Sequence, residues 1–238
     1  MPVETLVDKT ESLAGALVSR FEEAAGRALS LRDRFTVVLP GGSVASTFFP
    51  RLARASVDWS RTDFFWGDER AVPPSDPDSN YGAARSLWLD PAEVPEDRVH
   101  RLRGEATDLA REAEGHAALL ERIAGSPPRL DLVLLGVGPD GHVCSLFVGH
   151  PVLAERSRWV AVVEDAPKKP PRRLTMTMPV LVGAETVIVV ALGGGKAEIV
   201  RAAIEDPDSP LPVALVAREA RRTLFLLDPE AARLLRAR

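Results

Sequence analysis

An apolar segment runs directly into a glycine-rich turn at Leu132-Val-Leu-Leu-Gly-Val-Gly-Pro-Asp-Gly-His142. Short apolar runs that end in glycine and proline are typical of buried parallel strands rather than helices. In open α/β sheets, ligands bind beyond the carboxyl ends of such strands. The turn presents Asp140 and His142 at that position, so we predict both as candidate catalytic residues.

The same order of strand, glycine turn and helix returns elsewhere in the chain. It is found at Phe35–Leu39 with Pro40-Gly-Gly-Ser43 and a helix to about residue 54, and at Thr186–Leu192 with Gly193-Gly-Gly-Lys196 and a helix over Ala197–Ile204. We predict further strands at 63–66, 130–137, 159–163 and 223–227, and further helices at 9–30 and 105–124. This alternation predicts an α/β fold: a doubly wound, mostly parallel sheet with helices on both faces. The sequence has no internal repeat or linker, so we expect one domain over residues 1–238.

The start of the first helix is predicted from Asp8-Lys-Thr-Glu11. In a capping box, Asp8 accepts from the amide of Glu11 while the Glu11 side chain reaches back. Leu13, Leu17 and Phe21 then repeat at the spacing of an amphipathic helix.

Composition excludes several classes of function. The 238 residues are 45% hydrophobic with a net charge of −4, unlike the basic composition of nucleic-acid-binding proteins. No apolar stretch is long enough to span a bilayer, and the first residues lack the pattern of a signal peptide, so we expect a cytoplasmic protein. Cys144 is the single cysteine and the four histidines lack metal-ligand spacing, so we expect no disulfide, no metal and no cofactor.

Two glycine turns favour an anion-binding site. At Gly41, Gly42 and Ser43, glycines allow a close approach of the backbone, a helix N-terminus favours negative charge, and the serine adds a donor. Lys196 stands on the first turn of a second such helix. The alternative is a tight turn in which Ser43 is an N-cap and Lys196 a surface lysine.

Further charged residues lie beside predicted strands. Lys168, Lys169, Arg172 and Arg173 share a proline-rich loop, and Arg173 is the best placed because it directly precedes a strand. Guanidinium groups match phosphate oxygens, but a charge run is more often a solvated face. In Gly67-Asp-Glu-Arg70, Asp68 and Arg70 end a strand, where the alternative is a salt-bridged loop.

His142 and Cys144 each have a structural alternative. The place of His142 after a glycine turn at a strand end favours a reactive role over a capping or core histidine. Cys144 could be a nucleophile, but a lone cysteine more often packs as a small apolar residue.

Together these motifs resemble those of the 6-phosphogluconolactonases. The resemblance rests on Leu39-Pro-Gly-Gly-Ser43, Trp66-Gly-Asp-Glu-Arg70, Gly136-Val-Gly-Pro-Asp-Gly-His-Val-Cys-Ser-Leu-Phe147 and Pro170-Pro-Arg-Arg-Leu-Thr175. It covers almost the whole chain, and its most specific part is Asp-Gly-His-x-x-Ser-Leu-Phe. This chain departs from the family's usual proline after Leu-Phe, since it has Val148.

The resemblance implies a Rossmann-like fold and the hydrolysis of 6-phospho-D-glucono-1,5-lactone to 6-phospho-D-gluconate in the oxidative pentose phosphate pathway. His142 would be the base that activates water, and Asp140 would orient it or shape the turn. The substrate-binding residues would be Gly41, Gly42, Ser43, Arg173 and Lys196 for the phosphate, with Asp68 and Arg70 for the sugar or the oxyanion. The partner is thus a small sugar-phosphate lactone rather than nucleic acid or membrane, and we expect a monomer or small homo-oligomer.

Three other functions remain open from the sequence. Glucosamine-6-phosphate deaminases share the fold and the Gly-x-Asp-Gly-His segment, but they continue with a glutamate, whereas this chain has Ser145-Leu-Phe147. A non-catalytic sugar-phosphate sensor would carry a DNA-binding segment ahead of the fold. A dinucleotide-binding oxidoreductase would show GxGxxG after the first strand, which this chain lacks.

Overall fold

A computed structural model describes residues 3–236 of the chain. Its strands are β1 Glu4–Val7, β2 Phe35–Leu39, β3 Thr62–Trp66, β4 Asp68–Arg70, β5 Val99–His100, β6 Leu132–Gly136, β7 Val160–Val163, β8 Arg173–Met176, β9 Thr186–Ala191 and β10 Thr223–Leu227. Its α-helices are α1 Thr10–Arg32, α2 Gly42–Leu52, α3 Asn80–Ala84, α4 Leu109–Ala124, α5 Met178–Val182, α6 Ala197–Glu205, α7 Pro212–Glu219 and α8 Pro229–Ala232. Among the described residues, no helix is long and apolar enough to cross a lipid bilayer.

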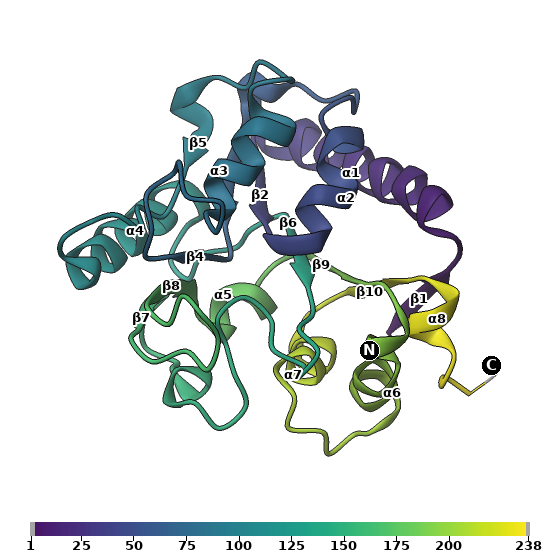
Figure 1. The fold of residues 1–238 in the computed structure, drawn as a ribbon. Coiled ribbons are helices and arrows are strands. Elements are labelled where there is room, and N and C mark those ends of the chain that lie inside the picture. The colour runs from purple at the N-terminus through teal and green to yellow at the C-terminus, as the bar shows by residue number, and fades with distance from the viewer. Residues whose placement is uncertain (1–2, 237–238) are drawn as a thin grey trace.

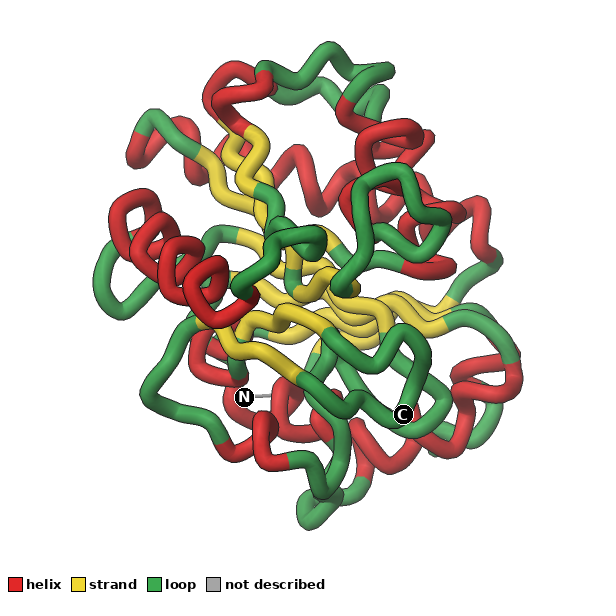
Figure 2. Tube along the Cα trace, turned by 60° about the vertical axis from the view of Figure 1, so that its left-hand side comes forward, coloured by secondary structure: helices red, strands yellow, loops and turns green. Residues whose placement is uncertain are grey.

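The apolar strands form a parallel sheet, as predicted. Within residues 3–236 it has seven strands in the order β1-β10-β9-β6-β2-β3-β5, and every pair is parallel. Strands β2 and β10 are buried along their whole length, which explains their unbroken apolar sequences. Figure 2 shows helices on both sides of the strand layer. The mostly parallel α/β fold is confirmed.

The two faces of the sheet are covered by different parts of the chain. Helices α1 and α2, drawn in purple and blue, lie on one side, while α6 and α7, in green and yellow, lie on the other (Figure 1). Helix α1 buries Leu13, Leu17 and Phe21 at helical spacing, and the Phe21 ring meets Phe35 of β2 edge to face at 5.2 Å. This packing anchors the helix over the centre of the sheet.

The predicted capping box of α1 is wrong. The helix begins at Thr10 with Lys9 as N-cap, and no side chain caps it. Asp8 lies one residue too early, because its amide donates to Leu227 O at 3.1 Å as an extension of β1. Its carboxylate accepts from the amide of Lys9 instead.

A small antiparallel sheet, which the sequence did not predict, stands at the carboxyl end of the large one. Its order is β4-β8-β7, so the segments predicted as strands near 160 and 174 belong here. The Gly67 amide donates to Leu39 O at 3.1 Å and its carbonyl accepts from Met176 N at 2.8 Å, so this residue joins the two sheets. The small sheet therefore carries β4 and β8 to the edge where ligands bind.

Strand order reverses between β2 and β6. From β2 the chain moves outward through β3 to β5, returns to β6 on the other side of β2, and then moves outward through β9 to β10. Such a switch point opens a crevice at the carboxyl ends of the strands. The turns that follow β2, β6 and β9 meet there.

Candidate active site

A cleft of about 160 Å³ opens at this switch point, between the turns that follow β2, β6 and β9. Most of the predicted site residues line it, namely Gly41, Gly42, Ser43, Asp68, Arg70, His142, Arg173 and Lys196. Asp140 stands behind the ring of His142 and is hydrogen-bonded to it. The fold thus brings together all the residues that the sequence suggested for catalysis and substrate binding.

The imidazole of His142 packs against the backbone of the turn that follows β6, at Gly138. The Gly138 amide donates to His142 O at 2.9 Å, and the ring lies so close that a Cβ at position 138 would be 2.0 Å from its Cε1 and Nδ1. On its other side the ring packs on Phe147, with centroids 4.7 Å apart. Glycine at 138 and the aromatic ring together fix the orientation of the histidine.

Asp140 determines which nitrogen of His142 carries hydrogen. Its Oδ1 lies 2.5 Å from His142 Nδ1 and 3.1 Å from Lys168 Nζ. Partial burial opposes ionisation of Asp140, but the contacts with His142 and Lys168 outweigh it and lower the pKa of this carboxyl to about 2. Because the carboxylate is ionised, the hydrogen belongs to Nδ1, and Nε2 keeps its lone pair.

Burial also holds His142 in its neutral form. Loss of solvent lowers the pKa of the imidazole, while Asp140 raises it and Lys168 lowers it again. The net pKa lies below that of a free histidine, so the ring is a neutral base near pH 7.

The floor of the cleft is a buried carboxylate, Asp68. It accepts from Ser145 Oγ at 2.6 Å and from Asn80 Nδ2 at 3.1 Å, and Arg173 Nη1 lies 3.8 Å away. The Asn80 amide lies over Gly41, where a Cβ would be 1.7 Å from its Oδ1. Asp68 is therefore part of the framework that joins the β2 turn, the β6 turn and β8.

Glu69 folds the proline-rich loop back onto β4. Its carboxylate accepts from the amides of Asn80 and Tyr81 at 2.8 Å each and from Ser79 Oγ at 3.0 Å. Burial raises the pKa of Glu69 in spite of these hydrogen bonds. Sequence reasoning assigned no role to Glu69, Asn80 or Ser145. The signals were the charged run at the end of β3 for Glu69 and the Asp-Gly-His-x-x-Ser-Leu-Phe segment for Ser145.

The neighbouring arginines Arg172 and Arg173 differ in burial and in hydrogen-bond partners. Arg173 is buried at the cleft, where its Nε donates to Pro170 O at 2.8 Å and its Nη2 to the carbonyls of Lys168 and Lys169 at 3.2 Å each. Arg172 is exposed and pairs with Glu164 at 2.6 Å. Only Arg173 is in reach of a ligand, and most of its donors already hold the loop.

The remaining predicted residues offer donors to the cleft. Ser43 is exposed in the first turn of α2, and the N-cap is Gly41, so the alternative of Ser43 as N-cap is wrong. Lys196 is half-buried, and this burial, followed by the charge of Lys168, lowers the pKa of its ammonium. Arg70 donates to Asp78 O, while its buried Nε has no hydrogen-bond partner within the described residues.

Cys144 lies beside the histidine without the features of a nucleophile. Its Sγ lies over Gly67, where an added Cβ would be 2.6 Å away. Burial raises the pKa of the thiol well above its ordinary value, so the reactive thiolate is disfavoured.

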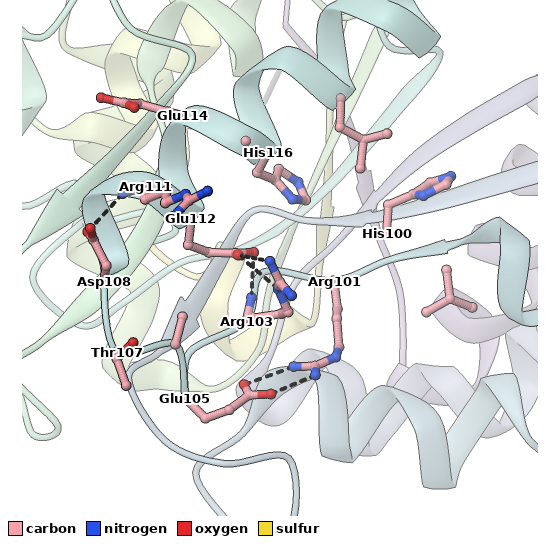
Figure 3. A pocket seen from close by; sticks show the side chains of 14 residues that line it. His100, Arg101, Arg103, Glu105, Thr107, Asp108, Arg111, Glu112, Glu114 and His116 are labelled. Atoms are coloured by element: carbon pink, nitrogen blue, oxygen red, sulfur yellow. Dashed lines mark hydrogen bonds and ion pairs between the residues drawn. The ribbon is translucent and has the colours of Figure 1, made fainter.

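A larger hollow of about 990 Å³ lies at the edge of the sheet, beside β5 and α4 (Figure 3). We call it the edge hollow; residues between Val99 and Leu119 line it. Two ion pairs cross it, Arg101 with Glu105 at 2.6 Å and Arg103 with Glu112 at 2.8 Å. Its lining has four carboxylates and three arginines, so it suits an anionic ligand less well than the cleft.

The fold and the cleft define an α/β enzyme with its site at the carboxyl edge of a parallel sheet. A family-level sequence profile described as glucosamine-6-phosphate isomerases/6-phosphogluconolactonase matches residues 8–225. A human 6-phosphogluconolactonase is 39% identical over 240 residues, covering 97% of this chain and 93% of that protein. One from Mycobacterium bovis is 36% identical over 234 residues, covering 94% of each chain.

A solved structure of 6-phosphogluconolactonase from Trypanosoma brucei superposes with a TM-score of 0.87 at 29% identity, and 99% of each chain is covered. The chain belongs to the family of glucosamine-6-phosphate isomerases and 6-phosphogluconolactonases.

Proposed function

We propose that this protein hydrolyses 6-phospho-D-glucono-1,5-lactone to 6-phospho-D-gluconate in the oxidative pentose phosphate pathway. The relatives named 6-phosphogluconolactonase support this activity over nearly the full chain. The observation that carries it is the Asp140–His142 pair at the cleft, followed by Ser145-Leu-Phe147 without a second carboxylate. One base and one water suffice to open an activated ester, whereas ring opening of an amino sugar needs a further acid.

His142 would act on both halves of the reaction. Its Nε2 takes a proton from water as the oxygen attacks C1, and a tetrahedral intermediate forms. The bond from C1 to the ring oxygen then breaks, and Nε2–H returns the proton to that oxygen. General base assistance of this kind contributes about 10²–10⁴-fold to the rate.

The phosphate would bind between the two glycine turns. Gly41, Gly42 and Ser43 open α2, and Lys196 reaches the same cleft from the turn before α6. Amide donors at a helix N-terminus and an ammonium suit a phosphate dianion. Arg173 contributes through Nη1, the end of its guanidinium that faces Ser145 and Asp68.

Asp68 and Arg70 would have different roles in this arrangement. Asp68 is engaged by Ser145 and Asn80, so we assign it to positioning the walls of the cleft. Arg70 lines the cleft and is in no ion pair among the described residues, so we assign it to the developing oxyanion or a sugar hydroxyl.

Freshly generated 6-phosphogluconolactone in a pH-stat tests the proposal, with spontaneous hydrolysis subtracted. We expect rapid acid release, and much slower release from unphosphorylated gluconolactone because the phosphate contacts are lost. Glucosamine 6-phosphate is the matched control. Release of ammonia from it without lactone hydrolysis would overturn the assignment in favour of a deaminase.

We further propose that the chain works as a single cytoplasmic domain, either as a monomer or as a small homo-oligomer. The match of one family profile to residues 8–225 supports the single domain.

A further inference from the structure

Lys168 reaches the catalytic pair from a loop outside the sheet. Its Nζ lies 3.1 Å from Asp140 Oδ1 and 3.4 Å from His142 Nδ1. The side chain is 36% exposed, so it crosses the surface to make these contacts. No other ammonium group in the described residues contacts either member of the pair.

The loop holds Lys168 in this place through its backbone. The carbonyl of Lys168 itself accepts from Arg173 Nη2 at 3.2 Å, and the Ala166 amide donates to Pro171 O at 2.9 Å. Arg173 is buried, so the anchor of the loop is fixed in the wall of the cleft. Lys168 is thus directed at the pair by the fold, unlike a freely solvated lysine.

One oxygen accepts from both neighbours. His142 Nδ1–H and Lys168 Nζ–H converge on Asp140 Oδ1, and the ammonium is closer to this oxygen than to Nδ1. An ammonium group only donates hydrogen bonds, so Lys168 brings a positive charge to the pair and no acceptor. The positive charge of Lys168 therefore offsets part of the stabilisation that the Asp140 carboxylate would give to a protonated His142.

We propose that Lys168 is a positioning residue for the base: it fixes the carboxylate of Asp140 and makes protonation of His142 less favourable. This inference rests on the proposed function of His142. Because the ammonium keeps Asp140 ionised, Nδ1 keeps its hydrogen and Nε2 stays free for the water.

Several charged groups act on His142 together. Asp140 on the same turn and Asp68 on β4 raise the pKa of the imidazole, while burial and Lys168 lower it. Lys196, from the turn before α6, acts on Lys168 and Asp140 from the far side of the cleft. Removal of Lys168 therefore leaves two carboxylates that favour the imidazolium.

The test compares Lys168→Met and Lys168→Arg with Lys169→Met, the exposed neighbour, as matched control. We expect the acid limb of kcat against pH to move to higher pH in Lys168→Met, and to return towards the wild-type position in Lys168→Arg. One pH unit below the new midpoint, about a tenth of the imidazole stays neutral, so kcat falls about tenfold. Lys169→Met should behave as wild type.

NMR titration of the His142 ring without substrate separates the two proposals. A higher imidazole pKa in Lys168→Met supports the coupling even if His142→Ala shows that His142 is not the base. An unchanged ring titration and pH profile, with a raised KM for the phosphorylated lactone alone, would overturn the inference and make Lys168 a phosphate ligand. Lys168→Gln repeats the ring titration if Lys168→Met does not fold.

Discussion

The cleft and the edge hollow are each lined by a histidine that pairs with an aspartate, at nearly the same distance. His142 and Asp140 meet at 2.5 Å in the cleft, and His100 and Asp63 meet at 2.6 Å beside the edge hollow. Asp63 also faces the guanidinium groups of Arg34 and Arg98, at 3.2 and 3.7 Å. The pair alone therefore does not define a reaction site.

The difference lies in what surrounds each pair. At the edge hollow, two of the three arginines are paired with glutamates, and four carboxylates in all line it, so carboxylates are in excess. At the cleft, the ion pairs join Lys168 to Asp140 and Arg173 to Asp68, and within the described residues Lys196 and Arg70 are left for a ligand. The cleft lining thus has an excess of cations, whereas the edge hollow has an excess of carboxylates.

Removal of the cleft histidine should have the largest effect. We expect His142→Ala to lower kcat by about 10²–10⁴-fold with little change in affinity for 6-phosphogluconate, because only the proton transfer is lost. His100→Ala, the matched change in the other pair, should cost stability but keep kcat. Near-normal turnover in His142→Ala, after subtraction of spontaneous hydrolysis, would place the base elsewhere.

Removal of an unmatched cation should have the next largest effect. A hydrogen bond to a charged group contributes about 1.5–3 kcal/mol, so Lys196→Ala should raise KM for the lactone roughly ten- to a hundredfold. Arg101→Ala in the edge hollow should leave KM unchanged, since Arg101 contacts Glu105. Steady-state kinetics of both variants measures these KM values. An equal rise of KM in the two variants would mean that the cleft and the edge hollow do not differ in ligand binding.

His116 in the edge hollow makes the free energy of unfolding depend on pH under acid conditions. Burial, and then the charge of His100, lowers the pKa of His116 from 6.5 to about 3. Below pH 6.5, His116 binds a proton in the unfolded chain but not in the folded protein. The free energy of unfolding therefore falls by about 1.4 kcal/mol per pH unit from pH 6.5 down to the folded pKa. Above pH 6.5, His116 does not make the free energy of unfolding depend on pH. His116→Leu should remove this contribution in urea unfolding between pH 6.5 and 4.5, and an unchanged acid dependence would contradict it.

The exposed arginine beside the cleft should have the smallest effect. Arg172 pairs with Glu164 on the surface, and such pairs contribute about 0–1 kcal/mol. We expect Arg172→Ala to leave kcat, KM and product affinity near wild type. Loss of product affinity in this variant would mean that Arg172, rather than Arg173, binds the phosphate.

The local sequence pattern was sufficient to predict strands of the large sheet. Phe35–Leu39 and Thr223–Leu227 were predicted with the bounds that the structure has, because a strand buried on both faces is apolar throughout. The small sheet was missed because it depends on pairing Asp68–Arg70 with a segment about 100 residues away. The capping box of Asp8 failed for a similar reason, since β1 pairs with the far end of the chain.

The same limit applies to the site. Turns at strand ends predicted His142, Ser43 and Lys196, because their neighbours in sequence mark the carboxyl edge of the sheet. Asn80 carries no such mark, and Ser145 was given no role although it follows the same turn as His142. Their importance arises only when a proline-rich loop and the β6 turn close on Asp68.

Position 138 has an evolutionary consequence. The ring of His142 occupies the space where any side chain at this position would begin. Every other amino acid carries a Cβ, so any substitution at position 138 would displace the ring of His142. If His142 is the base, we expect homologues that keep the activity to keep a glycine at this position.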